Sequence, residues 1–194
     1  MRLKIVQAGE PVLRVQARRL SRKELLSSET RQLIDWMRET MRDAPGVGLA
    51  APQVGLPLAL AVIEDPPEVQ RAIPPEKLAE RGRRPVPFHV IANPTLRLEG
   101  EPVEFFEGCL SLAGLTALVP RSLRAHVECL DHNGNPLTIH AEGWYARILQ
   151  HEIDHLNGAM YVDRMHTRSL MTIDHFTRLW SELPIAEVKK NLGI

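Results

Sequence analysis

The residues best suited to chemistry are two histidines and a glutamate in the segment QHEIDH, residues 150–155. His151 and His155 are four positions apart, so on a helix they lie one turn from each other and about 40° apart around its axis. Both imidazoles can therefore reach one metal ion. Glu152 projects about 100° further round, which is too far for a third ligand but close enough to reach a water on that ion. The pattern predicts a catalytic metal site on a helix.

A catalytic site of this kind needs a third protein ligand and one open coordination position. In a metzincin-like protease the pattern would continue to Gly158 and then to a histidine three residues later, but Tyr161 stands there. Cys109 is the candidate because it follows a strand-like run and the two histidines require a partner, although a buried free cysteine is usually a small hydrophobic residue. Cys129 is the competing thiol, but it lies in an alternating strand pattern and is interpreted as core.

A glycine-rich segment at residues 46–55, GVGLAAPQVG, has two interpretations. As structure, it is a turn whose small residues pack against a neighbouring element. As function, it is the wall of a ligand site, in which Gly46 and Gly48 expose backbone groups and the Gln53 amide donates a hydrogen bond. No Gly-Lys-Ser/Thr triplet follows, so the segment is not a phosphate-binding loop. The residues alone leave both interpretations open.

Hydrophobic periodicity places these segments on helices and short strands. A helix capped by Ser27 or Ser28 ends before Pro45, and a second helix runs from about Gly143 to Asn157. Strands are expected at residues 58–63, 88–92, 96–98, 103–106, 123–130 and 137–140, with a hairpin turn at 131–135. Residues 65–87, which hold six of the fifteen prolines, are expected to form a surface excursion with at most a short helix at 76–81, and the tail from His166 is expected to carry one or two helices.

The predicted fold is therefore α+β, with antiparallel β-sheets around a central metal-binding helix and further helices near both termini. A chain of 194 residues buries a sufficient core without disulfides, so residues 1–194 are expected to form a single globular domain.

Charge and cysteine content narrow the class of protein. Twenty-four basic residues balance twenty-four acidic ones, which removes the strong basic footprint of a dedicated nucleic-acid binder. Two cysteines make no disulfide framework and suit a reducing compartment. The longest apolar run, residues 56–63, is far shorter than the ~20 residues that span a bilayer. We expect a soluble intracellular protein, either in the bacterial cytoplasm or in a processed organellar form.

Taken together and in this order, the segments 46–55, 107–111 (EGCLS) and 150–155 resemble the three motifs of the peptide deformylase family. The segments PVLR at 11–14, NP at 93–94, ALVPR at 117–121 and YVDR at 161–164 look like the family as well, so the resemblance covers about residues 4–165. Pro45, the pair Leu115-Thr116, Trp144 after Gly143, and the long proline-rich excursion are similar to the branch that includes mitochondrial-type and some bacterial members.

The resemblance implies a metal-dependent hydrolase that removes the formyl group from the N-terminal methionine of new polypeptides and releases formate. It implies that Cys109, His151 and His155 hold one divalent metal ion, that Glu152 is the general acid and base, and that Gln53 and the Leu110 backbone N–H form the oxyanion site. Ferrous iron is the metal that the family favours, with zinc, nickel or cobalt as alternatives. A thiolate and two imidazoles suit both zinc and iron, so the spacing does not choose between them.

Substrate recognition is expected to be steric, because formyl and acetyl differ by one methyl group. The residues expected to line the substrate site are Gly46, Val47, Gly48, Ile148 and Trp144, with Ile148 lining the methionine slot, and the supporting ion pair expected beside Cys109 is Glu107 with Arg121. The implied partners are formyl-methionyl nascent peptides and the ribosome near its exit tunnel, with no nucleic-acid motif and no membrane span in the sequence.

Two other functions use the same residues. A zinc metallopeptidase would keep the His-Glu-His helix and take a third ligand downstream, such as Asp163, His166 or His175. A non-enzymatic peptide-binding module would keep a structural metal, but such a site has no use for Glu152 beside an open position.

Overall fold

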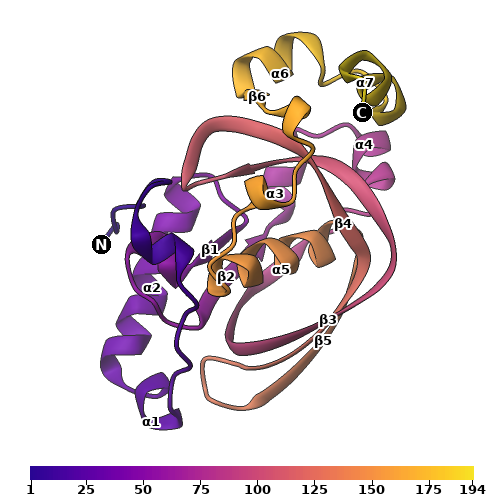
Figure 1. The fold of residues 1–194 in the computed structure, drawn as a ribbon. Helices are drawn as coiled ribbons and strands as arrows, with labels where there is room; N and C mark the ends of the chain where they lie inside the picture. The colour runs from indigo at the N-terminus through magenta and orange to yellow at the C-terminus, as the bar shows by residue number, and fades with distance from the viewer.

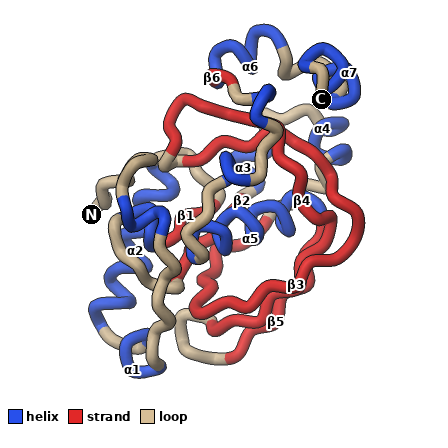
Figure 2. Tube along the Cα trace, in the orientation of Figure 1, coloured by secondary structure: helices blue, strands red, loops and turns tan.

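The computed structural model describes residues 1–194, and its six strands form one antiparallel sheet (Figures 1 and 2). The order is β1-β2-β3-β4-β5, and β6 pairs with β4 off this path. The strands are β1 (Gly48–Ala50), β2 (Leu60–Asp65), β3 (Val86–Cys109), β4 (Leu112–Leu130), β5 (Pro136–Glu142) and β6 (Met171–Thr172). The α+β class and the antiparallel pairing are confirmed, although the strands make one sheet and not several.

Helix α5 (Gly143–Leu156) lies inside the curve of the long β3 and β4 strands, while the other helices gather towards the two ends of the chain and in the excursion (Figure 1). These are α1 (Arg22–Leu25), α2 (Ser28–Asp43), α3 (Pro67–Gln70), α4 (Pro75–Glu80), α6 (Ile173–Leu179) and α7 (Ile185–Leu192). Four short 3-10 turns complete the chain: η1 (Pro11–Arg14), η2 (Ala51–Val54), η3 (Tyr161–Asp163) and η4 (Thr167–Ser169). No helix combines the length and the apolar character that crossing a membrane requires.

Strand β2 is buried along its whole length because helices cover both faces of the sheet at this point. Successive side chains of a strand point to opposite faces. Ala61 and Ile63 therefore join the core formed with α5, whereas Leu60 and Val62 join the core formed with α2. Helix α5 therefore packs on one face of β2, and α2 covers the opposite face.

An apolar stripe holds α5 in this position. Leu149, Ile153 and Leu156 are buried in the core shared with β2 and β5. The helix ends at Leu156, and Gly158 shortly after it has a φ of 74°, the left-handed conformation that favours glycine. A side chain there would also meet the backbone of Arg14 at 2.9 Å. Both the packing of its apolar face and the close contact of Gly158 with Arg14 therefore fix the position of α5.

The three separate strands predicted between residues 88 and 106 were wrong, since β3 runs through all of them. Register shifts interrupt its pairing with β4, and the first falls between Ala92 and Thr95. Asn93 at this bulge has a φ of 54°, and its side chain bonds to the backbone N–H and C=O of Leu20, both at 2.8 Å. A bulge breaks the alternation of apolar and polar residues without ending the strand, so the pattern was interpreted as separate pieces.

The excursion and the tail also differ in detail from the expectation. Residues 65–87 carry two short helices, α3 and α4, where at most one was expected. Pro67 and Pro75 occupy the first positions of these helices, where the missing N–H costs no hydrogen bond. The one or two helices expected in the tail are present as α6 and α7.

Candidate metal centre

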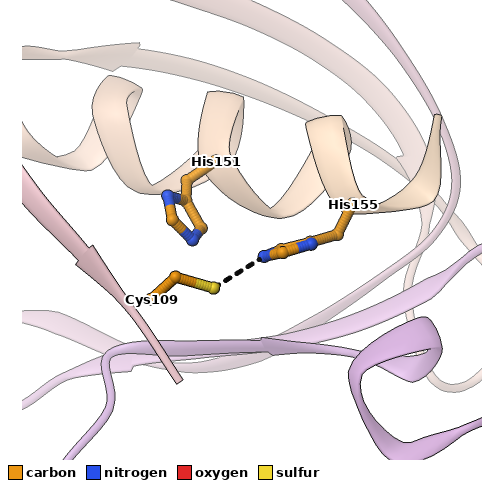
Figure 3. A group of neighbouring side chains, drawn as sticks. All are labelled: Cys109, His151 and His155. Carbon is orange, nitrogen blue, oxygen red and sulfur yellow. Dashed lines mark hydrogen bonds between the residues drawn. The ribbon is translucent and has the colours of Figure 1, made fainter. Parts of the chain in front are cut away.

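Three side chains from two elements that are far apart in the sequence point toward one another (Figure 3). Cys109 is the last residue of β3, while His151 and His155 project from successive turns of α5. One ligand atom from each lies within 4.8 Å of the other two, and the Cys109 Sγ is 3.2 Å from the His155 Nε2. The fold thus brings together the three residues that the sequence analysis singled out as metal ligands. Cys129 is buried in the apolar core instead.

The donor set fits one transition-metal ion. A sulfur and two imidazole nitrogens are three ligands that leave a fourth position open for a reacting molecule. Burial lowers the pKa of His155 well below its ordinary value, so this imidazole is neutral and keeps a lone pair for a metal. Beside it, Oε2 of Glu152 is buried without a hydrogen-bond partner. A buried polar atom of this kind requires a partner, which a ligand in the open position would supply.

The sulfur of Cys109 is positioned by the glycine-rich segment and by its own turn. The Gln53 Oε1 accepts a hydrogen bond from the Ala50 backbone N–H at 2.8 Å, which orients the amide so that its Nε2 lies 3.5 Å from the Cys109 Sγ. The backbone N–H of Ser111 donates to the same sulfur at 3.4 Å. Of the two interpretations of the glycine-rich segment, the ligand wall therefore has geometric support.

Glu107 holds His151 in one orientation. Its carboxylate accepts from the His151 Nδ1 at 3.1 Å and from two nitrogens of Arg121, both at 3.0 Å. Burial would raise the pKa of Glu107, but hydrogen bonds and charges from His151 and Arg121 hold it below its ordinary value. Because Nδ1 of His151 is engaged by a carboxylate, its Nε2 is free to face the ligand position.

Two further arginines of this network, the buried Arg147 and the exposed Arg164, were missed by the sequence analysis. Arg147 donates to Oε1 of Glu107 at 2.6 Å, and Arg164 donates to both oxygens of Asp154 at 2.6 Å. Arg147 lies four residues before His151, so both residues approach Glu107 from one face of α5. That spacing was a usable signal, whereas the contact of Arg164 depends on the fold after the helix.

Glu152 is almost fully buried next to the three ligands. Burial raises its pKa to about 7, against the opposing charge of His151. Its carboxylate packs against Gly48, where a Cβ atom would lie 2.2 Å from the Oε1. Glycine at this position therefore makes room for the carboxylate.

A cleft of about 500 Å³ opens at the metal centre. The predicted substrate-site residues Gly46, Val47, Gly48, Ile148 and Trp144 all line it, together with Gln53, Leu110, Cys109, His151 and Glu152. Residues that were not predicted also line it, among them Arg83 of the excursion, Phe106 of β3 and Ile173 of the tail. The cleft therefore brings apolar side chains next to Cys109, His151 and Glu152.

The ligands required by the metallopeptidase alternative are engaged elsewhere. Asp163 pairs with Arg14, His166 contacts the Glu104 carboxylate at 2.6 Å, and His175 contacts the Thr172 hydroxyl at 2.7 Å. None of the three belongs to the group around His151 and His155.

Comparison with known proteins gives a consistent assignment. A family model described as polypeptide deformylase matches residues 2–170. The chain is 43% identical to the chloroplastic peptide deformylase 1A of Solanum lycopersicum, over 98% of this chain and 67% of that protein. It is 46% identical to a peptide deformylase of Bifidobacterium adolescentis over 97% and 85% of the two chains, and 40% identical to the mitochondrial one of Homo sapiens over 87% and 70%.

Solved structures agree with the sequence comparison. A peptide deformylase from Synechococcus elongatus in complex with actinonin superposes with a TM-score of 0.71 at 39% identity, covering 84% of this chain and 79% of that chain. A class I type b peptide deformylase from Acinetobacter baumannii with Met-Ala-Ser bound gives a TM-score of 0.75 at 32% identity, covering 85% and 99%.

Proposed function

The chain belongs to the polypeptide deformylase family, and we propose that residues 1–194 perform its reaction as a single metallohydrolase domain. The reaction hydrolyses the amide that joins a formyl group to an N-terminal methionine, releasing formate and a free amine. The observation that carries the assignment of residues is the convergence of Cys109, His151 and His155 next to Glu152 in the wall of one cleft.

We assign one divalent metal ion to Cys109, His151 and His155, with ferrous iron as the resident ion and zinc, nickel or cobalt as ions that the same donors accept. When bound, such an ion supplies Lewis acidity and lowers the pKa of a coordinated water. The hydrogen bond from His151 to Glu107 supports this assignment, because it fixes the imidazole that must face the ion.

Glu152 is assigned the proton transfers. It accepts a proton from the attacking water as the water oxygen bonds to the formyl carbon. The carbonyl oxygen then carries the negative charge, and the Gln53 Nε2 and the Leu110 backbone N–H donate to it; one such donor is worth about 3 kcal/mol. Glu152 passes the proton to the amide nitrogen, the carbon–nitrogen bond breaks, and the amine leaves.

Selection of formyl over acetyl follows from the crowding of the cleft. A Cβ atom on Gly46 would already lie 2.8 Å from the Leu110 Cδ1, so the backbone of the glycine-rich segment approaches this side chain closely. We propose that an extra methyl group on the reacting carbon does not fit here. Ile148 is buried in the cleft wall about one turn before His151 on α5. We assign it, together with Val47 and Trp144, to the slot for the methionine side chain.

The direct test is formate release. The protein is purified without oxygen, loaded with ferrous iron or nickel, and given formyl-Met-Ala-Ser and acetyl-Met-Ala-Ser. We expect formate from the first peptide and no hydrolysis of the second. Absence of turnover on both peptides with the metal bound would contradict the proposal and would lead to a screen for endopeptidase activity.

Replacing Gly48 with alanine should lower kcat/KM by about 10²-fold, because a displaced catalytic carboxylate loses its proton-transfer geometry. The added Cβ would lie 2.2 Å from Oε1 and 2.5 Å from Cδ of Glu152, so the buried carboxylate has to move. Gly108→Ala is the matched control, since its Cβ would meet only the Leu115 carbonyl at 3.6 Å. Equal activity of the two variants in the formate assay would show that Glu152 tolerates displacement.

We propose that the substrates in the cell are formyl-methionyl nascent peptides, which the protein binds as they emerge near the exit tunnel of the ribosome. Related proteins include bacterial, chloroplastic and mitochondrial forms. We propose the bacterial cytoplasm as the compartment, with a processed organellar form as the alternative.

A further inference from the structure

The C-terminal segment contributes to the cleft although the family model stops at residue 170. Ile173, the first residue of α6, lines the same cleft as the metal centre. Its side chain is 48% exposed, which is high for a large aliphatic residue. It neither fills the core nor caps the helix, since the cap is the hydroxyl of Thr172, which accepts from the His175 N–H at 3.2 Å. A different role for this side chain is therefore open.

The backbone fixes Ile173 in the wall of the cleft. Strand β6 pairs with β4, with Thr172 opposite Leu115 and Met171 opposite Thr116. Thr116 is in turn paired with Gly108 of β3, the residue before Cys109. The tail thus extends the sheet beside β4, which itself pairs with the cysteine-bearing β3, and Ile173 follows directly after the β6 pairing.

The rest of the tail packs against β3 and α4, which fixes the position of Ile173. The ring of Phe176 packs 4.5 Å from that of Phe106, and Val188 of α7 is fully buried. Lys189 binds Glu104 of β3 at 2.6 Å, and Lys77 of α4 binds Glu182 at 2.6 Å. Figure 1 shows α6 and α7 lying over the same end of the molecule as α4.

The exposure of Ile173 in the cleft wall indicates which part of a peptide it meets. Under the proposed function, the formyl group lies at Glu152 and the methionine enters the buried slot at Ile148. The peptide must then leave the cleft towards solvent. A half-exposed aliphatic residue on the wall therefore faces the residues that follow the methionine, where burial against a large apolar side chain favours binding.

We propose that Ile173 is a specificity-determining residue, which contacts the side chain of a residue following the formyl-methionine and favours large apolar side chains there. The inference rests on the proposed function for the location of the formyl group. It assigns to the C-terminal segment a part in substrate selection.

The test compares kcat/KM for formyl-Met-Ala-Ala, formyl-Met-Leu-Ala and formyl-Met-Ala-Leu in the wild-type protein, Ile173→Ala and Leu179→Ala. Leu179 is the matched control, because it is an aliphatic residue of α6 that is 57% exposed but does not line the cleft. Wild-type protein should prefer at least one leucine peptide over the alanine peptide. Ile173→Ala should lower kcat/KM for that leucine peptide about five- to tenfold and leave formyl-Met-Ala-Ala within about twofold, since only the larger side chain loses apolar contact. Leu179→Ala should change none of the three.

Three outcomes would overturn the inference: no leucine preference in the wild type, an equal change on all peptides in Ile173→Ala, or the same loss of preference in Leu179→Ala. Each requires an active enzyme. A wild-type protein that released no formate from any formyl peptide would instead contradict the proposed function, so the two failures are distinguishable.

Discussion

Substituting Glu152 with glutamine should lower formate release by about 10²- to 10⁴-fold, the range that general acid–base catalysis contributes. Glutamine has nearly the same shape but cannot accept the proton of the attacking water or return it to the leaving amine. Because Glu152 is not assigned as a metal ligand, the variant should retain its full metal content. The measurements are formate release at saturating formyl-Met-Ala-Ser and metal analysis of the same sample.

The structural setting of Glu152 makes this substitution interpretable. Its Oε2 has no hydrogen-bond partner, so replacement by an amide breaks no ion pair of the surrounding network. We expect the free energy of unfolding to stay equal or to rise, since a buried carboxyl is removed. Glu128→Gln on the exposed face of β4 serves as control and should keep wild-type turnover. Undiminished activity in Glu152→Gln would mean that another group transfers the proton.

The parts of the fold that were predictable are those in which local chemistry and tertiary packing agree. Helix α5 separates an apolar stripe at Leu149 and Ile153 from the histidine face, so its periodicity is clear in the sequence. Strand β3 is the opposite case. Its bulge at Asn93 is stabilised by hydrogen bonds to Leu20, far away in the sequence, and no local pattern carries that information. A local break in alternation was therefore interpreted as the end of a strand.

The same division applies to the site. The choice of Cys109 over Cys129 could be made from the pattern, because one thiol follows a strand near glycine and the other lies within an alternating run. The role of Arg147 was within reach from its spacing to His151. Ile173 was not, since its place in the cleft depends on the pairing of two-residue β6 with β4 and on the docking of the tail. Long-range contacts of this kind leave almost no trace in composition or periodicity.

Replacing Cys109 with alanine should remove the metal together with the activity. A site with three protein ligands that loses its only sulfur keeps two imidazoles, which hold a divalent ion too weakly to survive dialysis against a chelator. We expect the bound metal to fall from stoichiometric to a small fraction, and formate release to fall with it. The metal content is measured by elemental analysis after dialysis, with circular dichroism as the check on folding.

Cys129→Ala is the matched control, because it also removes a free cysteine, here a buried one, but leaves the three ligands untouched. Its loss of core packing should lower the free energy of unfolding by about 1 kcal/mol, as expected for a small truncation, with metal content unchanged. Retention of the metal in Cys109→Ala would contradict the assigned ligand set. That result would favour the peptidase alternative, whose third ligand lies downstream of α5. Asp163 and His166 would then have to leave their present partners, Arg14 and Glu104. Loss of the metal in Cys109→Ala, with the metal retained in Cys129→Ala, would distinguish a metal ligand from a cysteine of the core.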